Sequence, residues 1–108
     1  MLNNFWHPHL ERCGFILKNN TVIECENISD TPQLTFKIAD SDIEKYAENI
    51  YCFWHSHPSD DVNLSLKDYQ LFLLYPEHKH RIYGSKVFAE YYVRRNFVMR
   101  EEYDFEIS

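Results

Sequence analysis

Five apolar residues in succession, from Ile50 to Trp54, constrain the fold of this 108-residue chain more than any other feature. The run contains no Gly or Pro and is too short for a helix. Such a run is typical of a central strand that is buried on both faces of a sheet. We therefore expect a sheet with this strand in its interior.

Helical patterns precede and follow this run. Residues 40–49 begin with candidate N-caps at Asp40, Ser41 and Asp42 and then carry apolar side chains at helical spacing. After a polar loop, Ser65 begins a second helical segment that stops near Pro76. One face of this second helix is predicted to carry Leu66, Tyr69 and Leu73.

Further strands are predicted near both ends of the chain. Residues 13–18 and 21–25 are apolar runs separated by Asn19-Asn20, which can take the positive φ of a tight hairpin turn. Residues 79–107 are predicted to form strands, with Arg95-Asn96 as the turn before the last one. One face of that last strand should present Phe97, Met99, Tyr103, Phe105 and Ile107.

These elements define the expected fold class. Residues 34–38 alternate apolar and polar side chains and predict one more strand. Apolar residues make up 44% of the chain and Gly is present only twice, so a packed core is expected rather than disorder. We expect a single α/β domain over residues 1–108, with a mixed sheet flanked by two or three helices.

Charge and composition exclude several function classes. The 11 basic against 17 acidic residues give a net charge of −6, which disfavours nucleic acid as a partner. Apolar stretches such as Leu71 to Tyr75 are far shorter than the roughly 18–20 residues that cross a bilayer, and the first residues lack a basic region. We therefore expect a cytoplasmic protein with no membrane segment or signal peptide. Three cysteines without a Cys-x-x-Cys pair predict buried thiols in a reducing compartment: Cys13, Cys25 and Cys52.

Two histidines leave the predicted central strand together, as His55-Ser56-His57. Side chains alternate along extended backbone, so both imidazoles point the same way and can reach one metal ion. A catalytic zinc site needs three protein ligands, and Asp68 is the best placed carboxylate. If Ser65 caps the following helix, Asp68 lies in its first turn and can face the histidines. The same two residues also have the spacing of a capping box, which by itself indicates only a helix start.

The His-x-His pair alone is weak evidence, because the chain contains three of them, at positions 7 and 9, 55 and 57, and 78 and 80. Only the middle pair continues as His-x-His-x7-Ser-x2-Asp, which ends with Ser65 and Asp68. A chain of this composition contains that pattern by chance in roughly one case in a thousand. We expect the other two pairs to be surface or core histidines.

An upstream element completes a family pattern. Glu11 opens the sequence Glu-x-Cys-Gly, and this element followed by the histidine and aspartate motif resembles the JAMM metalloproteases, also called the MPN-plus or Mov34/PAD-1 family. The resemblance extends over about residues 5–84. It implies that Glu11 contacts a metal-bound water and that Ser65 supports the tetrahedral intermediate. It also implies a Zn²⁺ ion with three protein ligands: His55, His57 and Asp68.

The resemblance predicts a zinc-dependent peptidase or isopeptidase. Zinc lowers the pKa of bound water toward about 7, and Glu11 would pass a proton from the attacking water to the leaving amine. Zinc and the Ser65 hydroxyl would stabilise the oxyanion, where one lost donor costs on the order of 10²–10³ in rate. Cys13 and Gly14 are expected to be structural, the first filling the core and the second allowing close packing.

Weaker likenesses indicate the class of substrate. Family members that cleave ubiquitin isopeptide bonds carry insertions around this core, whereas this chain is nearly the bare core, which disfavours a deubiquitinase. Residues 27–32, Phe36 and Asp42 resemble the JAMM portion of bacteriophage tail assembly proteins, where a cell-wall peptidase domain of the NlpC/P60 type often follows. This likeness implies a peptide or protein substrate, phage tail or cell-wall components as partners, and a virion or infected-cell setting.

Two alternatives belong to other classes. The first is a non-catalytic interaction module of the same fold, which serves phage tail assembly. Family members of that kind usually lack the ligands or the glutamate, and this chain has all five residues of the pattern. The second is a zinc nucleobase deaminase, which requires His-x-Glu followed by Pro-Cys-x-x-Cys, and neither element is present. A metallopeptidase is the favoured function.

Overall fold

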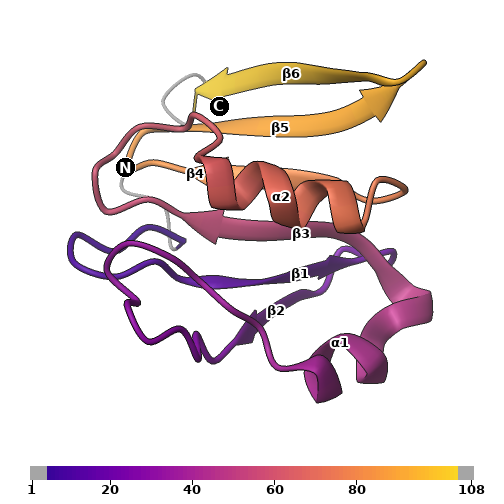
Figure 1. Ribbon diagram of the computed structural model, residues 1–108, viewed down its shortest axis with the longest axis horizontal. Helices are drawn as coiled ribbons and strands as arrows, with labels where there is room; N and C mark the ends of the chain where they lie inside the picture. Colours follow the sequence, from indigo (N-terminus) through magenta and orange to yellow (C-terminus); the bar gives the residue numbers. More distant parts are fainter. Residues whose placement is uncertain (1–4, 105–108) are drawn as a thin grey trace.

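A mixed sheet of six strands, in the order β2-β1-β3-β4-β5-β6, forms the centre of the structure (Figure 1). The computed structural model describes residues 5–104. The strands are β1 (Cys13–Leu17), β2 (Val22–Cys25), β3 (Ile50–Ser56), β4 (Lys79–Tyr83), β5 (Val87–Arg94) and β6 (Phe97–Asp104). The helices are α1 (Asp40–Tyr46), the 3₁₀ turn η1 (Ala47–Asn49) and α2 (Leu66–Leu74).

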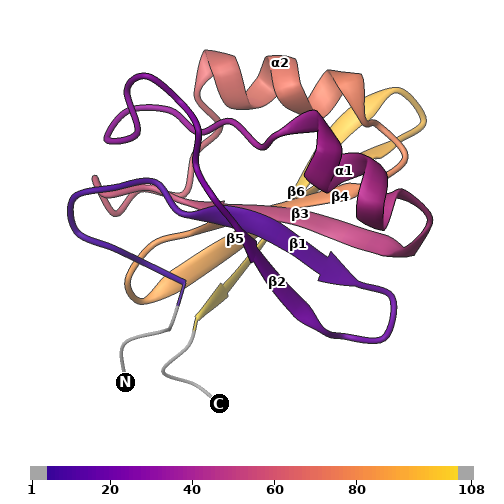
Figure 2. The same ribbon diagram turned by 90° about the horizontal axis from the view of Figure 1, so that it is seen from below.

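Both α-helices lie on the same face of the sheet, and the ends of the described chain lie on the other side (Figure 2). Strands β3 and β4 pair in parallel, while the other neighbouring strands pair antiparallel. A parallel pair needs a crossover connection, which α2 provides here. The described residues therefore form one α/β domain with a mixed sheet and two α-helices, as the sequence predicted.

Strand β3 is the predicted central strand, and apolar groups cover both of its faces. On the helical side, Ile50 and Phe53 pack with Phe15 in one buried cluster. On the opposite side, Trp54 packs in a second cluster with Tyr83. No helix lies over this second face in the described part of the chain, so aromatic side chains of the sheet, together with Phe5 from the segment before β1, exclude water from it.

The predicted hairpins are confirmed at both ends of the sheet. Asn20 has φ of 71° in the turn between β1 and β2, and Arg95 and Asn96 have φ of 53° and 69° between β5 and β6. Asn tolerates this left-handed region better than most residues, because its short side chain bonds to the local backbone. The predicted strand positions Phe105 and Ile107 lie outside the described residues.

The strand predicted at residues 34–38 is wrong. The amides of Leu34 and Thr35 both donate to the carbonyl of Thr31, and the amide of Lys37 donates to the side chain of Asn27. These local bonds occupy backbone groups that a strand would use for pairing. The segment is a loop. Its last apolar residue, Ile38, packs into the core beneath α1.

Both helices exist where they were predicted, but two details differ. The N-cap of α1 is Ala39, which has no capping side chain, rather than a polar residue at positions 40–42. The predicted apolar face of α2 is its exposed face, which carries Leu66, Tyr69 and Leu73. The buried residues of α2 are Asp68 and Phe72, one turn apart. The helix is rotated so that a carboxylate and an aromatic ring face the sheet.

The predicted burial of the three cysteines is confirmed. Cys13, Cys25 and Cys52 are all buried and free. Burial raises the pKa of each thiol, to about 12 for Cys13 and Cys52 and about 11 for Cys25, so these thiols stay protonated. Among the described residues, no helix has the length and apolar character needed to span a bilayer.

Candidate metal centre

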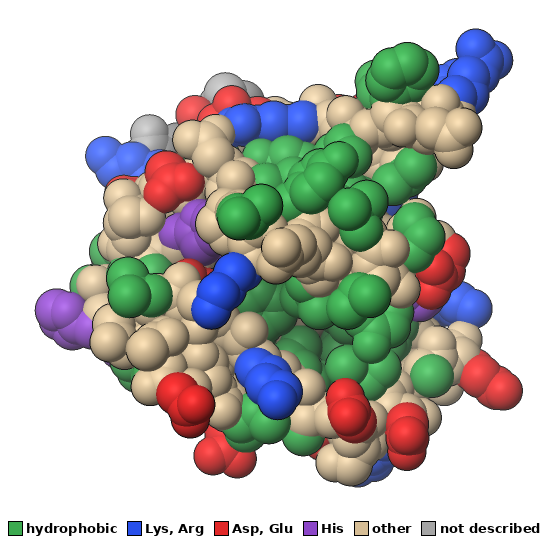
Figure 3. Space-filling view, in the orientation of Figure 1, with side chains coloured by type: hydrophobic (Ala, Val, Ile, Leu, Met, Phe, Trp, Pro, Cys, Tyr) green, Lys and Arg blue, Asp and Glu red, His purple; other side chains and the backbone are tan. Residues whose placement is uncertain are grey.

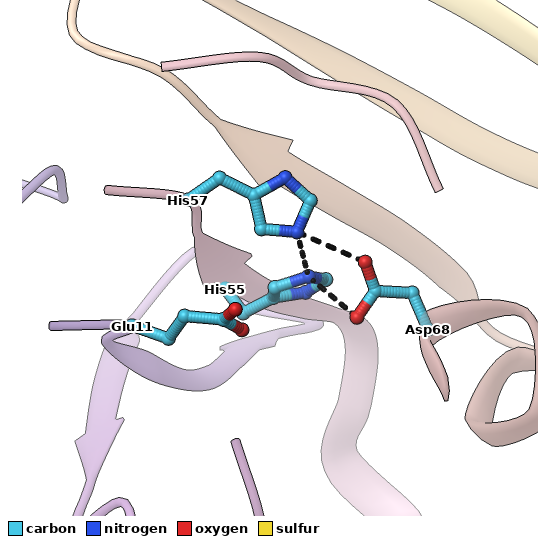
Figure 4. A group of neighbouring side chains, drawn as sticks. All are labelled: Glu11, His55, His57 and Asp68. Carbon is cyan, nitrogen blue, oxygen red and sulfur yellow. Dashed lines mark hydrogen bonds and ion pairs between the residues drawn. The ribbon is translucent and has the colours of Figure 1, made fainter. Parts of the chain in front are cut away.

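The two histidines of the central motif project from the end of β3 toward one point. The extended backbone continues beyond His55, because the amide of His57 donates to the carbonyl of Tyr83 on β4 at 3.1 Å. Side chains two residues apart therefore share a face. The Nε2 atoms of His55 and His57 lie 3.1 Å apart (Figure 4).

Asp68 completes the cluster from the first turn of α2. Its Oδ1 lies 3.0 Å from Nε2 of His55, and its Oδ2 lies 2.9 Å from Nε2 of His57. The amide of Ser65 donates to Oδ2 of Asp68 at 3.0 Å, and the amide of Asp68 donates to Oγ of Ser65 at 3.1 Å. The carboxylate of Asp68 thus takes part both in the capping box and in the contact with the two histidines.

Glu11 approaches the same point from the segment before β1. The candidate ligand atoms of Glu11, His55, His57 and Asp68 all lie within 4.8 Å of one another, and all four residues are buried. The main chain of Glu11 is held at both ends, since its amide donates to the carbonyl of Pro32 and its carbonyl accepts from Asn27. Its Oε1 atom is buried and has no hydrogen-bond partner. A buried carboxylate oxygen without a partner is costly unless a proton or a cation compensates it.

The pKa values reflect this crowding of buried ionisable groups. Burial raises the pKa of Glu11 to about 8 and lowers the pKa of His55 below its usual value. Burial alone would also lower the pKa of His57, but the hydrogen bond and charge of Asp68 outweigh it and raise that pKa. Burial would raise the pKa of Asp68, but the two histidines hold it well below its ordinary range. The cluster is therefore a water-poor environment in which one firmly ionised carboxylate lies beside two imidazole nitrogens and a second carboxyl group, which suits a cation.

Neighbouring groups orient the two imidazole rings. Nδ1 of His57 lies 3.0 Å from the carbonyl oxygen of Asp61, so an Nδ1–H can donate there and leave Nε2 as the lone-pair nitrogen. The indole of Trp6 donates to the carbonyl of His57 at 2.8 Å. The ring of Phe36 stacks on His55 with a centroid separation of 4.3 Å. Sequence reasoning missed these supporting contacts, because two of them are made to backbone carbonyls and leave no side-chain signal.

The other two His-x-His pairs contain surface and core histidines, as predicted. His9 is exposed and His7 is partly buried, and Nδ1 of His7 accepts from the amides of His9 and Leu10. His80 lies in the core against the rings of Phe53 and Phe72, and its Nε2 has no hydrogen-bond partner. Burial lowers its pKa to about 3, so His80 is neutral at physiological pH.

Solvent reaches the cluster through a cavity of about 220 Å³. Glu11, His57 and Ser65 line this cavity, together with polar loop residues such as Gln33, Ser59 and Asn63. The hydroxyl of Ser65 belongs to an exposed residue, so it can meet a ligand there while its oxygen accepts from the amide of Asp68. The structure thus brings all five predicted site residues to one place, four of them as candidate metal ligands.

Comparison with known proteins adds nothing to this picture, since no family model and no curated protein matches the chain. The four clustered residues offer two imidazole nitrogens and carboxylate oxygens from two acids, and they can hold a metal ion.

Proposed function

We propose that this protein is a zinc-dependent peptidase or isopeptidase of the JAMM type. The observation that carries the proposal is the convergence of His55, His57 and Asp68 beside Glu11, buried yet open to a polar cavity. Catalytic zinc sites combine three protein ligands of this type with an open position for water or substrate. A purely structural zinc site is usually closed by four protein ligands and does not need an adjoining cavity.

The donor set fits zinc better than a hard cation such as Mg²⁺ or Ca²⁺. Imidazole nitrogen is a preferred ligand of zinc, whereas magnesium and calcium take oxygen ligands. The contact of Nδ1 of His57 with a backbone carbonyl is the outer-shell arrangement common to zinc-bound histidines. We assign His55, His57 and Asp68 as the ligands and leave the unpaired carboxylate of Glu11 for proton transfer.

The chemistry divides between the ion and the residues around it. When bound, zinc supplies Lewis acidity that lowers the pKa of water and polarises a carbonyl group. Glu11 would take a proton from the attacking water and deliver it to the leaving amine. Burial raises the pKa of Glu11 to about 8 without metal, and a nearby cation would lower it again, so the two opposing effects favour proton exchange near neutral pH, as a general acid and base needs.

Ser65 would act on the developing oxyanion. Its oxygen already accepts from the amide of Asp68, which leaves the hydroxyl hydrogen free to point into the cavity that Glu11 and His57 also line. A fixed donor of this kind stabilises charge that develops in the transition state. The substrate in this proposal is a peptide or protein, with phage tail or cell-wall components as partners.

A digest of a peptide library with the zinc-loaded protein tests the proposal. We expect cleavage by the unaltered protein and by Glu26→Gln, which changes an exposed glutamate, but none by Glu11→Gln. Zinc analysis should find about one ion per chain in all three proteins, because Glu11 is not assigned as a ligand. Unchanged cleavage by Glu11→Gln would remove Glu11 from the mechanism. Absence of cleavage in every protein would favour the non-catalytic interaction module.

A further inference from the structure

An apolar cavity adjoins the candidate metal cluster, since Asp68 forms part of its wall. It has a volume of about 230 Å³ and opens between α1 and α2. Its apolar walls come from Ile43 of α1, Phe53 of β3, and Leu71 and Leu74 of α2. Figure 3 shows hydrophobic side chains gathered in this hollow between the two helices, with basic side chains beside it.

The cavity shares a wall with the metal centre. Asp68 lines it, and so does Phe36, whose ring stacks on His55 at 4.3 Å. Glu11, His57 and Ser65 line the separate polar cavity, which shares no lining residue with the apolar one. The cluster therefore contributes residues to both cavities, and a chain bound at the cluster can contact both.

We propose that this apolar cavity is the specificity pocket of the enzyme, and that it takes one large apolar side chain of the peptide beside the scissile bond. The inference rests on the proposed function, and it adds a substrate class to it: peptides with Leu, Met or Phe next to the cleaved bond. Asp68 is the only assigned metal ligand among the residues that line the pocket. The side chain of a peptide can therefore bind there without a metal ion.

Volume and lining accommodate this occupant. One ordered water needs roughly 10–15 Å³ of such volume, so about 230 Å³ has ample room for one large side chain. Pockets that are mostly apolar with a few polar groups bind ligands by burying apolar surface and orienting the rest. The polar side chains of the lining include Lys37 and Lys67, which can donate to the main chain of the peptide, and the acidic groups of Asp40 and Asp68.

Two adjacent leucines of α2 provide a matched pair of variants. Leu74 lines the cavity although its side chain is 71% exposed, so Leu74→Lys should fold while placing a charge in the pocket. Leu73 is 51% exposed and does not line the cavity, so Leu73→Lys is the control. A third variant, Leu71→Lys, blocks the pocket from a deeper position, and circular dichroism checks that each variant folds.

The first experiment measures binding without turnover, by NMR titration of the metal-free full chain. The probes are N-acetyl-phenylalaninamide, N-acetyl-leucinamide and N-acetyl-glycinamide. We expect the first two to shift backbone amides of α1 and α2 and to bind roughly tenfold or more tightly than the glycine probe. Leu74→Lys and Leu71→Lys should remove this preference, and Leu73→Lys should keep it. Equal binding of all three probes would overturn the pocket whether or not the protein is a peptidase.

The second experiment repeats the peptide-library digest with the same variants. We expect an apolar residue at one fixed position beside the cleaved bond, with the preference reduced roughly tenfold or more by Leu74→Lys and unchanged by Leu73→Lys. Cleavage without an apolar preference would overturn the pocket and leave the proposed function standing. Apolar probe binding without any cleavage would overturn the proposed function and, with it, the role of the cavity in selecting a scissile bond, while leaving a site that binds apolar side chains. A dimer in sedimentation that Leu74→Lys dissolves, with no probe binding, would make the cavity a contact between copies of this chain and overturn the proposal.

Discussion

Ser65 and Asp68 cap each other at the start of α2: each backbone amide donates to the other side chain, at 3.0 and 3.1 Å. The carboxylate that caps the helix also lies 2.9–3.0 Å from both imidazoles of the central motif. The position of the helix and the geometry of the metal site therefore depend on one another. Experiments on either residue need variants that separate the capping role from the chemical one.

Replacement of Ser65 can separate these roles. An N-cap Gly costs only a few tenths of a kcal/mol relative to Ser, so Ser65→Gly should keep a near-normal melting temperature while losing the hydroxyl donor. We expect its kcat to fall on the order of 10²–10³-fold with zinc content unchanged. Ser65→Thr retains the hydroxyl and should recover most of the activity. Equal kcat for the Gly and Thr variants would show that the hydroxyl has no part in turnover.

Removal of a ligand should abolish metal binding and the stability that the metal confers. His57→Ala should carry no stoichiometric zinc by elemental analysis, whereas His9→Ala, which changes an exposed histidine, should carry about one ion per chain. At free zinc 100-fold above Kd, binding contributes about 2.7 kcal/mol to the free energy of unfolding. Chelation should therefore lower the melting temperature of His9→Ala but not that of His57→Ala. Full zinc occupancy in His57→Ala would refute the ligand assignment.

Gly14 is required by a close approach between strands. A Cβ at this position would lie 1.9 Å from the carbonyl oxygen of Ile23 and 2.9 Å from Nε1 of Trp54. Gly14→Ala must push β1 and β2 apart, and overpacking of this kind costs about 1–3 kcal/mol. Urea denaturation should show this loss, whereas Ser41→Ala on exposed α1 should stay within about 0.5 kcal/mol of the unaltered protein. A Gly14→Ala protein of normal stability would contradict the close packing.

His80 should make the fold sensitive to mild acid. Burial lowers its pKa from 6.5 to about 3, so the unfolded chain binds a proton at a higher pH than the folded one. Its contribution is fully present above pH 6.5 and is lost as the pH falls from about 6.5 toward 3, by up to about 1.4 kcal/mol per pH unit. His80→Leu should lose stability less steeply over this range. Chemical denaturation at several pH values measures the difference, and parallel pH profiles of the two proteins would rule out this role.

Local sequence patterns predicted much of the fold. The turns at Asn19-Asn20 and Arg95-Asn96, the central strand and both helices lie where the patterns placed them. Each of these features depends on residues within a few positions of one another, through backbone dihedral preferences and side-chain periodicity. The strand predicted at residues 34–38 is wrong for the same reason. The side chains alternate as in a strand, but backbone amides of this segment donate to Thr31 and Asn27 instead of to a neighbouring strand.

The rotation of α2 shows where local patterns mislead. Leu66, Tyr69 and Leu73 form an apolar stripe at helical spacing, yet this stripe faces solvent. The helix instead turns Asp68 toward the histidines and Phe72 toward His80, because these contacts satisfy buried polar and aromatic groups. Only the packing of α2 against β3 and β4 decides which face of the helix is buried.

In the candidate site, too, some features follow from the sequence and others only from the tertiary structure. By itself, the sequence determined which residues could bind a metal, since the spacing of His55 and His57 on a strand and of Ser65 and Asp68 on a helix turn is local geometry. Glu11 was predicted only through the family resemblance, and the tertiary structure gives the physical reason that it joins them: β1 pairs antiparallel with β3, and the bond between Arg12 and Ser56, 44 positions apart, extends that register. The apolar cavity beside Asp68 likewise forms only when α1, α2 and β3 pack together. Strand register and helix packing join segments distant in the chain, and no spacing within one segment encodes them.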